Sequence, residues 1–168
     1  MLATLVDDPF SDPEWIFETK WDGFRSVCFV KDGKSQFVSR NQIDMTPQYP
    51  ELAGVGKQVA AKEAILDGEI VALDKDGMPR FQLLQPRVGR KSGLEALRGQ
   101  GHIVYYVFDL LYLDGYDLTS CALVERKAVL QRILKPANFI KLSEHIAGDG
   151  EAFFKQIEKF QLEESGRT

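Results

Sequence analysis

The segment ETKWDGFR, residues 18–25, places one lysine between a run of strand-forming residues and a glycine turn. Trp, Ile, Phe and Thr favour β-strands, so residues 15–20 are expected to form a strand with Lys20 at its end. A lysine amine is a nucleophile only when it is neutral, and an ordinary pKa of about 10.4 keeps it protonated at neutral pH. Desolvation, a metal or nearby cations can lower such a pKa. By itself, Lys20 is therefore either a covalent catalyst or a surface lysine that enters a tight turn.

Strand-forming segments follow this lysine, and Asp-Gly pairs separate several of them. Residues 24–30 and 35–40 flank Asp32-Gly33, and this arrangement is typical of a β-hairpin. Residues 65–73 predict another strand, which contains polar residues near its start. Residues 102–112, HIVYYVFDLLY, are almost continuously apolar, which predicts a strand with both faces buried.

The remaining elements complete an α+β fold. They are helices over residues 50–61, 123–134 and 151–164 and a strand over residues 138–142. This order predicts mainly antiparallel sheets flanked by helices. With 168 residues, of which 44% are hydrophobic and 27% charged, the chain fits one ordinary globular domain.

The composition restricts the classes of protein and of site. Cys28 and Cys121 form no CxxC pattern, so we expect two reduced thiols and neither a zinc site nor a disulfide framework. No apolar run approaches the roughly 20 residues of a membrane span, and the N-terminus lacks the cationic start of a signal peptide. These features predict a cytoplasmic protein that does not bind a membrane.

One segment is locally basic although the formal net charge of the chain is -4. This net charge argues against nucleic-acid binding through bulk positive charge. Between residues 80 and 98, however, the basic side chains outnumber the single acid Glu95; they are Arg80, Arg87, Arg90, Lys91 and Arg98. The segment is either a solvated loop or a phosphate-binding surface.

Four motifs of this chain occur in the order found in covalent nucleotidyltransferases. Residues 20–25, KWDGFR, resemble the Lys-x-Asp-Gly-x-Arg motif of ATP-dependent DNA ligases, RNA ligases and mRNA-capping guanylyltransferases. Residues 39–41 (SRN), 67–69 (DGE) and 106–111 (YVFDLL) resemble three further motifs of these enzymes. The closest resemblance is to the ligase module of the bacterial ligase D family, which serves non-homologous end joining. This resemblance extends to residues 1–5, 81–85, 143–146 and 148–151, so it covers nearly the whole chain.

The resemblance implies a chemical role for the lysine and for the residues near the base. Lys20 would attack the α-phosphorus of ATP, expel pyrophosphate and carry AMP to the 5′-phosphate of a DNA nick, which the 3′-hydroxyl then seals. Phe108 would stack on the adenine, and Glu18 would approach the adenine edge. Without the resemblance, an aromatic residue in a buried strand such as Phe108 is more often part of the core.

Charged residues of the other motifs would bind ribose, phosphate or metal. The resemblance implies that Arg25 binds ribose or phosphate and that Arg40 approaches the nick 5′-phosphate. Glu69 would accept hydrogen bonds from the ribose or hold a divalent metal, and Asp67 is the weaker metal candidate. The metal implied is Mg²⁺, with Mn²⁺ as a substitute. Without the resemblance, Asp67 and Glu69 would be interpreted as capping or salt-bridge partners.

The chain departs from the family pattern near residue 163. Glu163 is the candidate for the acidic position of the next motif and for a metal ligand, but the glycine and the lysines of that motif are not in the sequence. The final lysine motif and an oligonucleotide-binding barrel are not in the sequence either. We therefore expect residues 1–168 to form a single, incomplete adenylation domain that folds but is almost inactive as a ligase by itself.

Three functions agree with these motifs. The resemblance favours an ATP-dependent DNA ligase that acts on nicked or broken double-stranded DNA in repair, together with other end-joining proteins or domains. An RNA ligase or a capping-type nucleotidyltransferase is the first alternative, and a non-catalytic nucleotide- or DNA-end-binding module is the second. Covalent attachment of labelled ATP or GTP, and sealing of nicked DNA or RNA, would distinguish the three.

Overall fold

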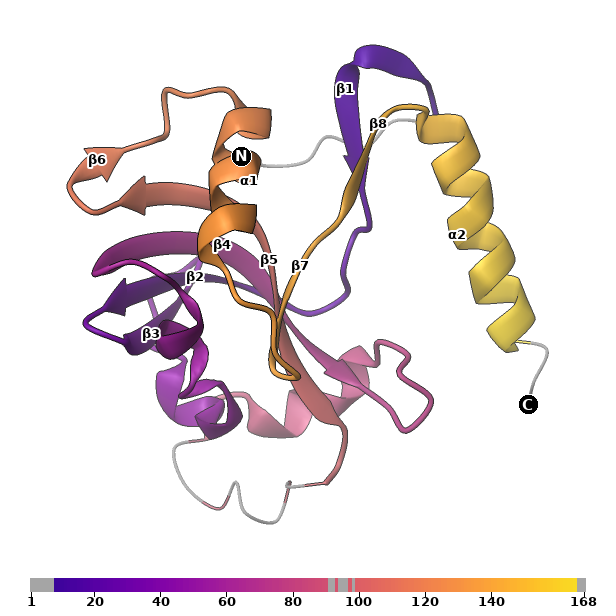
Figure 1. Ribbon diagram of the computed structural model, residues 1–168. Helices are drawn as coiled ribbons and strands as arrows, with labels where there is room; N and C mark the ends of the chain where they lie inside the picture. Colours follow the sequence, from indigo (N-terminus) through magenta and orange to yellow (C-terminus); the bar gives the residue numbers. More distant parts are fainter. Residues whose placement is uncertain (1–7, 91–92, 94–96, 98, 166–168) are drawn as a thin grey trace. The chain divides into compact units, whose positions relative to one another are not determined.

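The computed structural model describes residues 8–90, 93, 97 and 99–165, with side chains up to residue 159 in these ranges. The chain forms two compact units. The terminal unit combines the N-terminal residues up to Lys20 with the residues from Ser143 onward, and the central unit spans Trp21–Leu142 (Figure 1). The single-domain organisation expected from the sequence stays a prediction.

A six-stranded sheet forms the central unit, in the order β3-β2-β4-β5-β6 with β7 beside β5. Neighbouring strands are antiparallel except β5 and β7, which are parallel. The strands are β2 (Phe24–Lys31), β3 (Lys34–Ser39), β4 (Glu63–Leu73), β5 (His102–Leu113), β6 (Tyr116–Asp117) and β7 (Ile140–Leu142). Helix α1 (Leu123–Ile133) packs against β5. This arrangement confirms the predicted α+β architecture.

The hairpin predicted around Asp32-Gly33 is confirmed by β2 and β3. Asp32 and Gly33 both have positive φ values, 49° and 73°. A two-residue turn of this kind matches the right-handed twist of the strands that it connects. Glycine adopts positive φ without steric cost, and aspartate tolerates it better than most residues do. The turn therefore sets the register of β2 and β3 locally.

The helix expected over residues 50–61 is wrong. The chain there forms short 3₁₀ helices, which are η1 (Thr46–Gln48), η2 (Pro50–Leu52) and η3 (Val55–Gln58). A Cβ atom at Gly56 would lie 2.6 Å from the carbonyl oxygen of Gly33. This close approach to the hairpin turn requires glycine, and glycine weakens a helix relative to alanine. Two more 3₁₀ helices, η4 (Phe81–Leu83) and η5 (Gln85–Arg87), follow β4.

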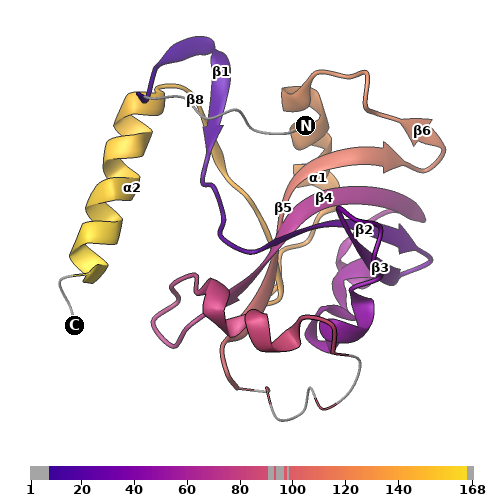
Figure 2. The same ribbon diagram turned by 180° about the vertical axis from the view of Figure 1, so that it is seen from behind.

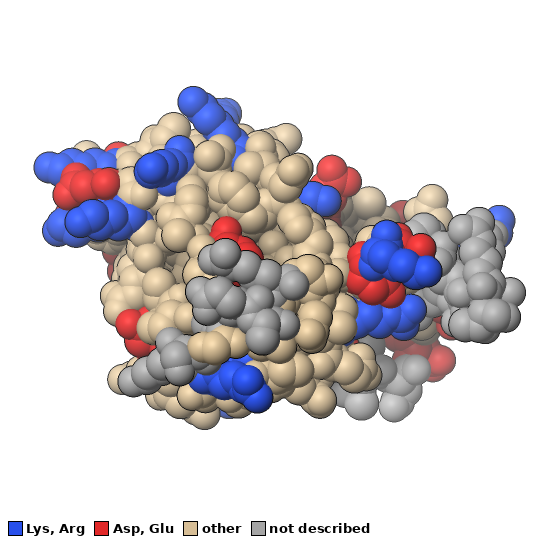
Figure 3. Space-filling model, turned by 90° about the horizontal axis from the view of Figure 1, so that it is seen from below, with Lys and Arg blue, Asp and Glu red and all other residues tan. Residues whose placement is uncertain are grey.

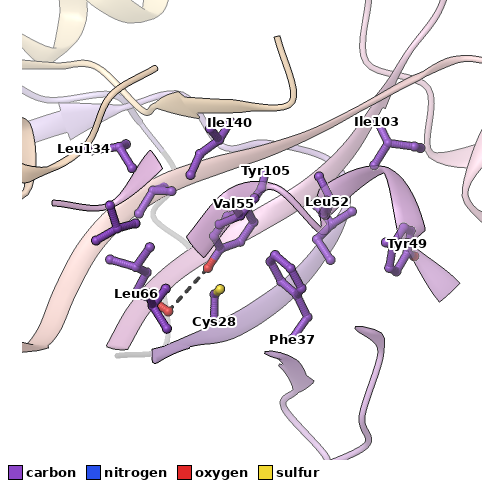
Figure 4. Close-up of a cluster of buried hydrophobic side chains, with 14 of the residues drawn as sticks. Cys28, Phe37, Tyr49, Leu52, Val55, Leu66, Ile103, Tyr105, Leu134 and Ile140 are labelled. Carbon is purple, nitrogen blue, oxygen red and sulfur yellow. Dashed lines mark hydrogen bonds between the residues drawn. The ribbon is translucent and has the colours of Figure 1, made fainter. Parts of the chain in front are cut away.

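Buried side chains lie on both faces of β5. Tyr105 belongs to the main core, whereas Tyr106 belongs to a second cluster, because successive strand residues point to opposite faces. Figure 4 shows part of the main core, including Cys28, Phe37, Leu52, Leu66, Tyr105 and Ile140. The second cluster consists of Val71, Leu73, Val104 and Tyr106, with Trp21 packed against it. The predicted two-sided burial of this strand is confirmed between Ile103 and Val107.

In the terminal unit, β1 (Asp12–Glu18) pairs antiparallel with β8 (His145–Gly148), and α2 (Gly150–Ser165) follows β8 (Figure 2). The sequence did not predict β8, because a strand of four residues carries little local pattern and its partner is distant in the chain. Strand β1 ends before Lys20 and not at it. In the described chain, no helix combines the length and apolar character needed to cross a membrane.

Candidate functional site

Three strands bring four of the sequence-predicted site residues onto one face of the central sheet. Arg25 in β2 lies opposite Glu69 in β4, and Asp67 in β4 lies opposite Asp109 in β5. The residues of β4 alternate, so that its even positions enter the main core while Asp67 and Glu69 point to the other side, as Val71 does. We call this side, with Arg25, Asp67, Glu69 and Phe108, the outer face.

An ion pair between Arg25 and Asp67 lies at the centre of the outer face. Nε of Arg25 donates to Oδ1 of Asp67 at 3.1 Å, and Nη2 donates to Oδ2 at 2.6 Å. The Asp67 side chain is 8% exposed and that of Arg25 is 38% exposed. The hydrogen bonds to Asp67 raise the pKa of Arg25, and the charges of Asp67, Glu69 and Asp109 add to this effect. Asp67 therefore orients a guanidinium that still reaches the surface.

Phe108 sits at a β-bulge in β5. Consecutive residues Asp67 and Gly68 of β4 pair with Asp109 and Val107, so Phe108 is the additional residue of β5. A bulge re-aims a side chain and is common next to functional sites. The guanidinium carbon of Arg25 lies 5.6 Å from the centroid of the Phe108 ring. Phe108 is half-buried and belongs to neither buried cluster among the described residues, which favours a surface role over a core role.

The sequence did not identify the residue that anchors this bulge. Asp109 accepts hydrogen bonds from Nε and Nη2 of Arg126 in α1, both at 2.8 Å, and Oδ1 also accepts from the amide of Leu110 at 2.8 Å. Arg126 in turn donates from Nη1 to the carbonyl of Cys121 at 2.6 Å. The Asp109 carboxylate raises the pKa of Arg126 mainly through these hydrogen bonds. Asp109 directly follows Phe108 in the YVFDLL motif, so the sequence offered a signal for this aspartate. No signal in the sequence pointed to Arg126 as its partner.

The residues that follow Lys20 are held against β4 and β5. The Trp21 ring stacks on the Tyr106 ring with centroids 3.7 Å apart and an interplanar angle of 17°. A Cβ atom at Gly23 would collide with the carbonyl oxygen of Ile70 and would lie 3.0 Å from Cγ of Glu69. The glycine of the KWDGFR motif is therefore required by close packing on β4.

Three predicted residues belong to the terminal unit and not to the central unit. Glu18 is the last residue of β1 and lies opposite His145 of β8. Lys20 is exposed, and it is the last residue of the terminal unit, so one peptide bond joins it to Trp21. Glu163 lies in α2, but its side chain is outside the described residues.

Arg40 and Arg25 line the same cleft of the central unit, which has a volume of about 520 Å³. Its mainly apolar lining includes two exposed side chains, Ile43 and Val88. We call it the arginine cleft; it is lined by Gly23, Phe24, Arg25, Ser39, Arg40, Asn41, Ile43, Met45, Gln48, Val88 and Gly89. Arg40 lies in the turn directly after β3.

The basic segment does not form a continuous phosphate-binding surface in its described part. Arg80 pairs with Asp74 at 2.8 Å, Arg87 is buried in an ion pair with Glu51, and Arg90 is exposed. Lys91 and Arg98 lie outside the described residues. On the face shown in Figure 3, basic side chains occur in separate groups, and acidic side chains lie beside several of them. Within the ranges that the structure describes, no three His, Cys, Asp or Glu side chains are grouped so that they could hold a metal ion.

Comparison with known proteins identifies relatives over most of the chain. The family model described as "ATP dependent DNA ligase domain" matches residues 1–165. A DNA ligase of Methanococcus aeolicus is 34% identical over 148 residues, which are 87% of this chain and 26% of that protein. The multifunctional non-homologous end joining protein LigD of Pseudomonas aeruginosa is 39% identical over 134 residues, which are 80% of this chain and 15% of that protein.

A solved structure has the same fold. The mycobacterial DNA ligase D complexed with ATP and MES superposes with a TM-score of 0.68 at 31% identity, and the match covers 86% of this chain and 44% of that chain. The chain thus spans about a quarter of the length of the first relative, less than a sixth of the second, and less than half of the solved structure.

Proposed function

The chain belongs to the ATP-dependent DNA ligase domain family, and from this premise we propose that it carries out the adenylation chemistry of a DNA ligase. Nζ of Lys20, after losing its proton, attacks the α-phosphorus of ATP and forms a P–N bond while the bond to pyrophosphate breaks. An oxygen of the nick 5′-phosphate then attacks the AMP phosphorus, and the P–N bond breaks. Finally the 3′-hydroxyl attacks the 5′-phosphorus, and AMP leaves as the strand is sealed.

The observation that carries this proposal is the grouping of Arg25, Glu69 and Phe108 on the outer face, next to the segment that follows Lys20. Phe108 offers an aromatic ring at the surface, which suits stacking on adenine. Arg25, held by Asp67, offers a guanidinium for ribose or phosphate. In this proposal Glu18, from the terminal unit, approaches the adenine edge.

A divalent metal fits these residues as a partner of one carboxylate and of the substrate phosphates. Both carboxylate oxygens of Asp67 accept hydrogen bonds from Arg25, which supports Asp67 as the weaker of the two metal candidates. Mg²⁺ typically binds through one or two carboxylates together with phosphate oxygens, and a larger protein cage is not required. When bound, Mg²⁺ or Mn²⁺ would neutralise charge on the phosphates. Glu163 is a further candidate ligand, of lower rank.

Nicked or broken double-stranded DNA is the proposed polynucleotide substrate. The arginine cleft supports this, since Arg40 offers a cation beside an apolar wall that suits deoxyribose and phosphate. Similarity to LigD proteins makes end-joining repair, with other repair proteins or domains as partners, the proposed context. A DNA substrate would place the chain in the bacterial cytoplasm or nucleoid.

Intact-mass spectrometry tests the covalent step. The chain, alone and fused to the part of the Methanococcus aeolicus ligase that follows the matched region, is incubated with Mg²⁺ and either ATP or GTP. We expect the mass of one AMP to be added to the fusion with ATP only, little or no adduct on the chain alone, and none on the fusion that carries Lys20→Ala. An adduct that persists in Lys20→Ala would exclude Lys20 as the nucleophile. ATP binding by calorimetry without any adduct in the fusion would instead favour a non-catalytic binding module.

A further inference from the structure

Arg87 is a charged residue that the proposed chemistry does not use, and the central unit buries it almost completely. Its side chain is 1% exposed. Nη1 and Nη2 donate to Oε2 and Oε1 of Glu51 at 3.1 and 2.8 Å. Nη1 also donates to the main-chain carbonyl of Gln48 at 3.3 Å, and the guanidinium carbon lies 5.8 Å from the centroid of the Tyr49 ring. A guanidinium buried this deeply needs such partners to offset the loss of water.

These contacts connect two segments that line the arginine cleft. The partners of Arg87 lie in and beside η1 and η2, and Gln48 from this segment lines the cleft. Arg87 itself ends η5 and directly precedes Val88 and Gly89, which line the cleft from the second segment. The two segments are far apart in the sequence, and short 3₁₀ helices have weaker hydrogen-bond geometry than α-helices. A bidentate arginine–carboxylate pair supplies the geometric precision that such segments lack.

We infer that Arg87 and Glu51 form a clamp that positions the walls of the arginine cleft for DNA, so that Arg87 is a positioning residue and not a phosphate ligand. This inference rests on the proposed DNA-ligase function. It separates Arg87 from Arg40, because the guanidinium of Arg87 is enclosed and already paired, whereas Arg40 lines the cleft. It also explains why the basic segment contains an arginine that contributes no charge to the surface.

The clamp and simple electrostatics predict opposite effects of one substitution, Glu51→Gln, on the affinity for DNA. Replacing Glu51 by Gln removes a negative charge, which by itself should strengthen the binding of polyanionic DNA. If the clamp positions the cleft, the same substitution should weaken binding, because the neutral amide cannot hold the guanidinium in the bidentate arrangement. Glu51 is about one-third exposed, so this change is gentler than truncating the buried Arg87.

The test measures the affinity of the chain for a fluorescent nicked duplex across a series of salt concentrations. We expect Glu51→Gln and Arg87→Lys to bind about fivefold more weakly, as expected for sites coupled through structure, with an unchanged slope of affinity against salt. Glu63→Gln is the matched control, since Glu63 is an ion-paired acid outside the cleft, and it should bind at least as tightly as the wild type. Arg40→Ala should lower the slope by about 1, as loss of a phosphate contact does.

Two outcomes would overturn the clamp. Unchanged or tighter binding by folded Glu51→Gln would show that the pair does not position the cleft. A slope reduced by about 1 in folded Arg87→Gln, which removes the positive charge, would make Arg87 a direct phosphate contact. If neither the chain nor its fusion to the Methanococcus aeolicus segment binds nicked DNA, the proposed function fails, and amide hydrogen exchange still tests the clamp. We expect Glu51→Gln to speed amide exchange at Gln48 and Val88 but not at Leu66, relative to the wild type. Exchange at Gln48 and Val88 that is as slow as in the wild type would contradict the clamp.

Discussion

The ring of Tyr105 lies against Gly68, where a Cβ atom would approach its Cε2 and Cζ atoms to 2.7 Å. The phenol oxygen of Tyr105 donates to the main-chain carbonyls of Ser26 at 2.8 Å and Leu66 at 3.3 Å, and the second of these hydrogen bonds is drawn in Figure 4. The glycine between Asp67 and Glu69 thus makes room for a side chain that links β2 to β4 beneath the outer face. This packing ties the DGE motif to the core.

Gly68→Ala should destabilise the chain by about 1–3 kcal/mol, the usual cost of inserting a methyl group into a well-packed core. The carbonyl oxygen of Tyr106 lies 2.5 Å from the same Cβ position, so the main chain would have to move. Urea unfolding at neutral pH measures this change. A loss below about 0.5 kcal/mol, the range of ordinary surface substitutions, would show that the space above Gly68 adapts easily.

Phe108→Ala should weaken ATP binding by about 1–3 kcal/mol, the typical value of base stacking on an aromatic side chain. Its thermal stability should change little, because the ring is half-buried and lies at a bulge. Calorimetry and thermal melting on the same sample separate the two effects.

Phe37→Ala is the matched control for this substitution. Phe37 is fully buried in the main core, so its truncation should cost roughly 3–5 kcal/mol of stability. If Phe108→Ala melts as early as Phe37→Ala and retains its affinity for ATP, Phe108 is a core residue and the stacking role is wrong.

Asp67→Asn should reduce the yield of adenylated chain more than it reduces stability. The amide keeps one acceptor for Arg25 but loses the charge and the second acceptor, so the guanidinium is held less firmly. Because Arg25 is partly exposed, the cost in stability should stay near about 1 kcal/mol. Comparison with Asp74→Asn, which weakens an ion pair away from the outer face, controls for loss of charge. Equal adenylation in both variants would contradict the orienting role.

Stability should fall as pH rises above about 9. Burial raises the pKa of Cys28 above its ordinary value of 9.0, and burial raises those of Tyr105 and Tyr49 above 10.0. Between the unfolded and folded pKa values the unfolded chain loses a proton that the folded chain keeps, so alkaline pH favours unfolding. Each such group contributes a slope of about 1.4 kcal/mol per pH unit.

Urea midpoints between pH 7 and pH 10.5 measure this loss of stability. Cys28→Ala should reduce the fall of stability with pH that begins near the ordinary pKa of a thiol. The same burial predicts that Cys28 resists alkylation in the folded chain, whereas the less buried Cys121 reacts. Constant stability up to the end of that range would show that these groups ionise as easily in the folded chain as in the unfolded one.

Local patterns in the sequence were sufficient wherever the structure depends on neighbouring residues. The Asp32-Gly33 turn predicted the β2–β3 hairpin, because the turn geometry depends on two residues only. The apolar run of β5 predicted its two-sided burial. The motif residues Arg25, Asp67, Glu69 and Phe108 were also found from sequence, although their arrangement on one face was not.

Only the tertiary structure decided the features that depend on distant residues. The helix expected over residues 50–61 was wrong because Gly56 packs on Gly33, a contact that no local pattern contains. The bulge at Phe108 arises from the register between β4 and β5, and the burial of Arg87 depends on Glu51 from another segment. Register and ion pairing depend on which segments meet in space. The KWDGFR motif can therefore be recognised in the sequence, whereas the partners that hold its arginine, Arg25, in place are known only from the fold.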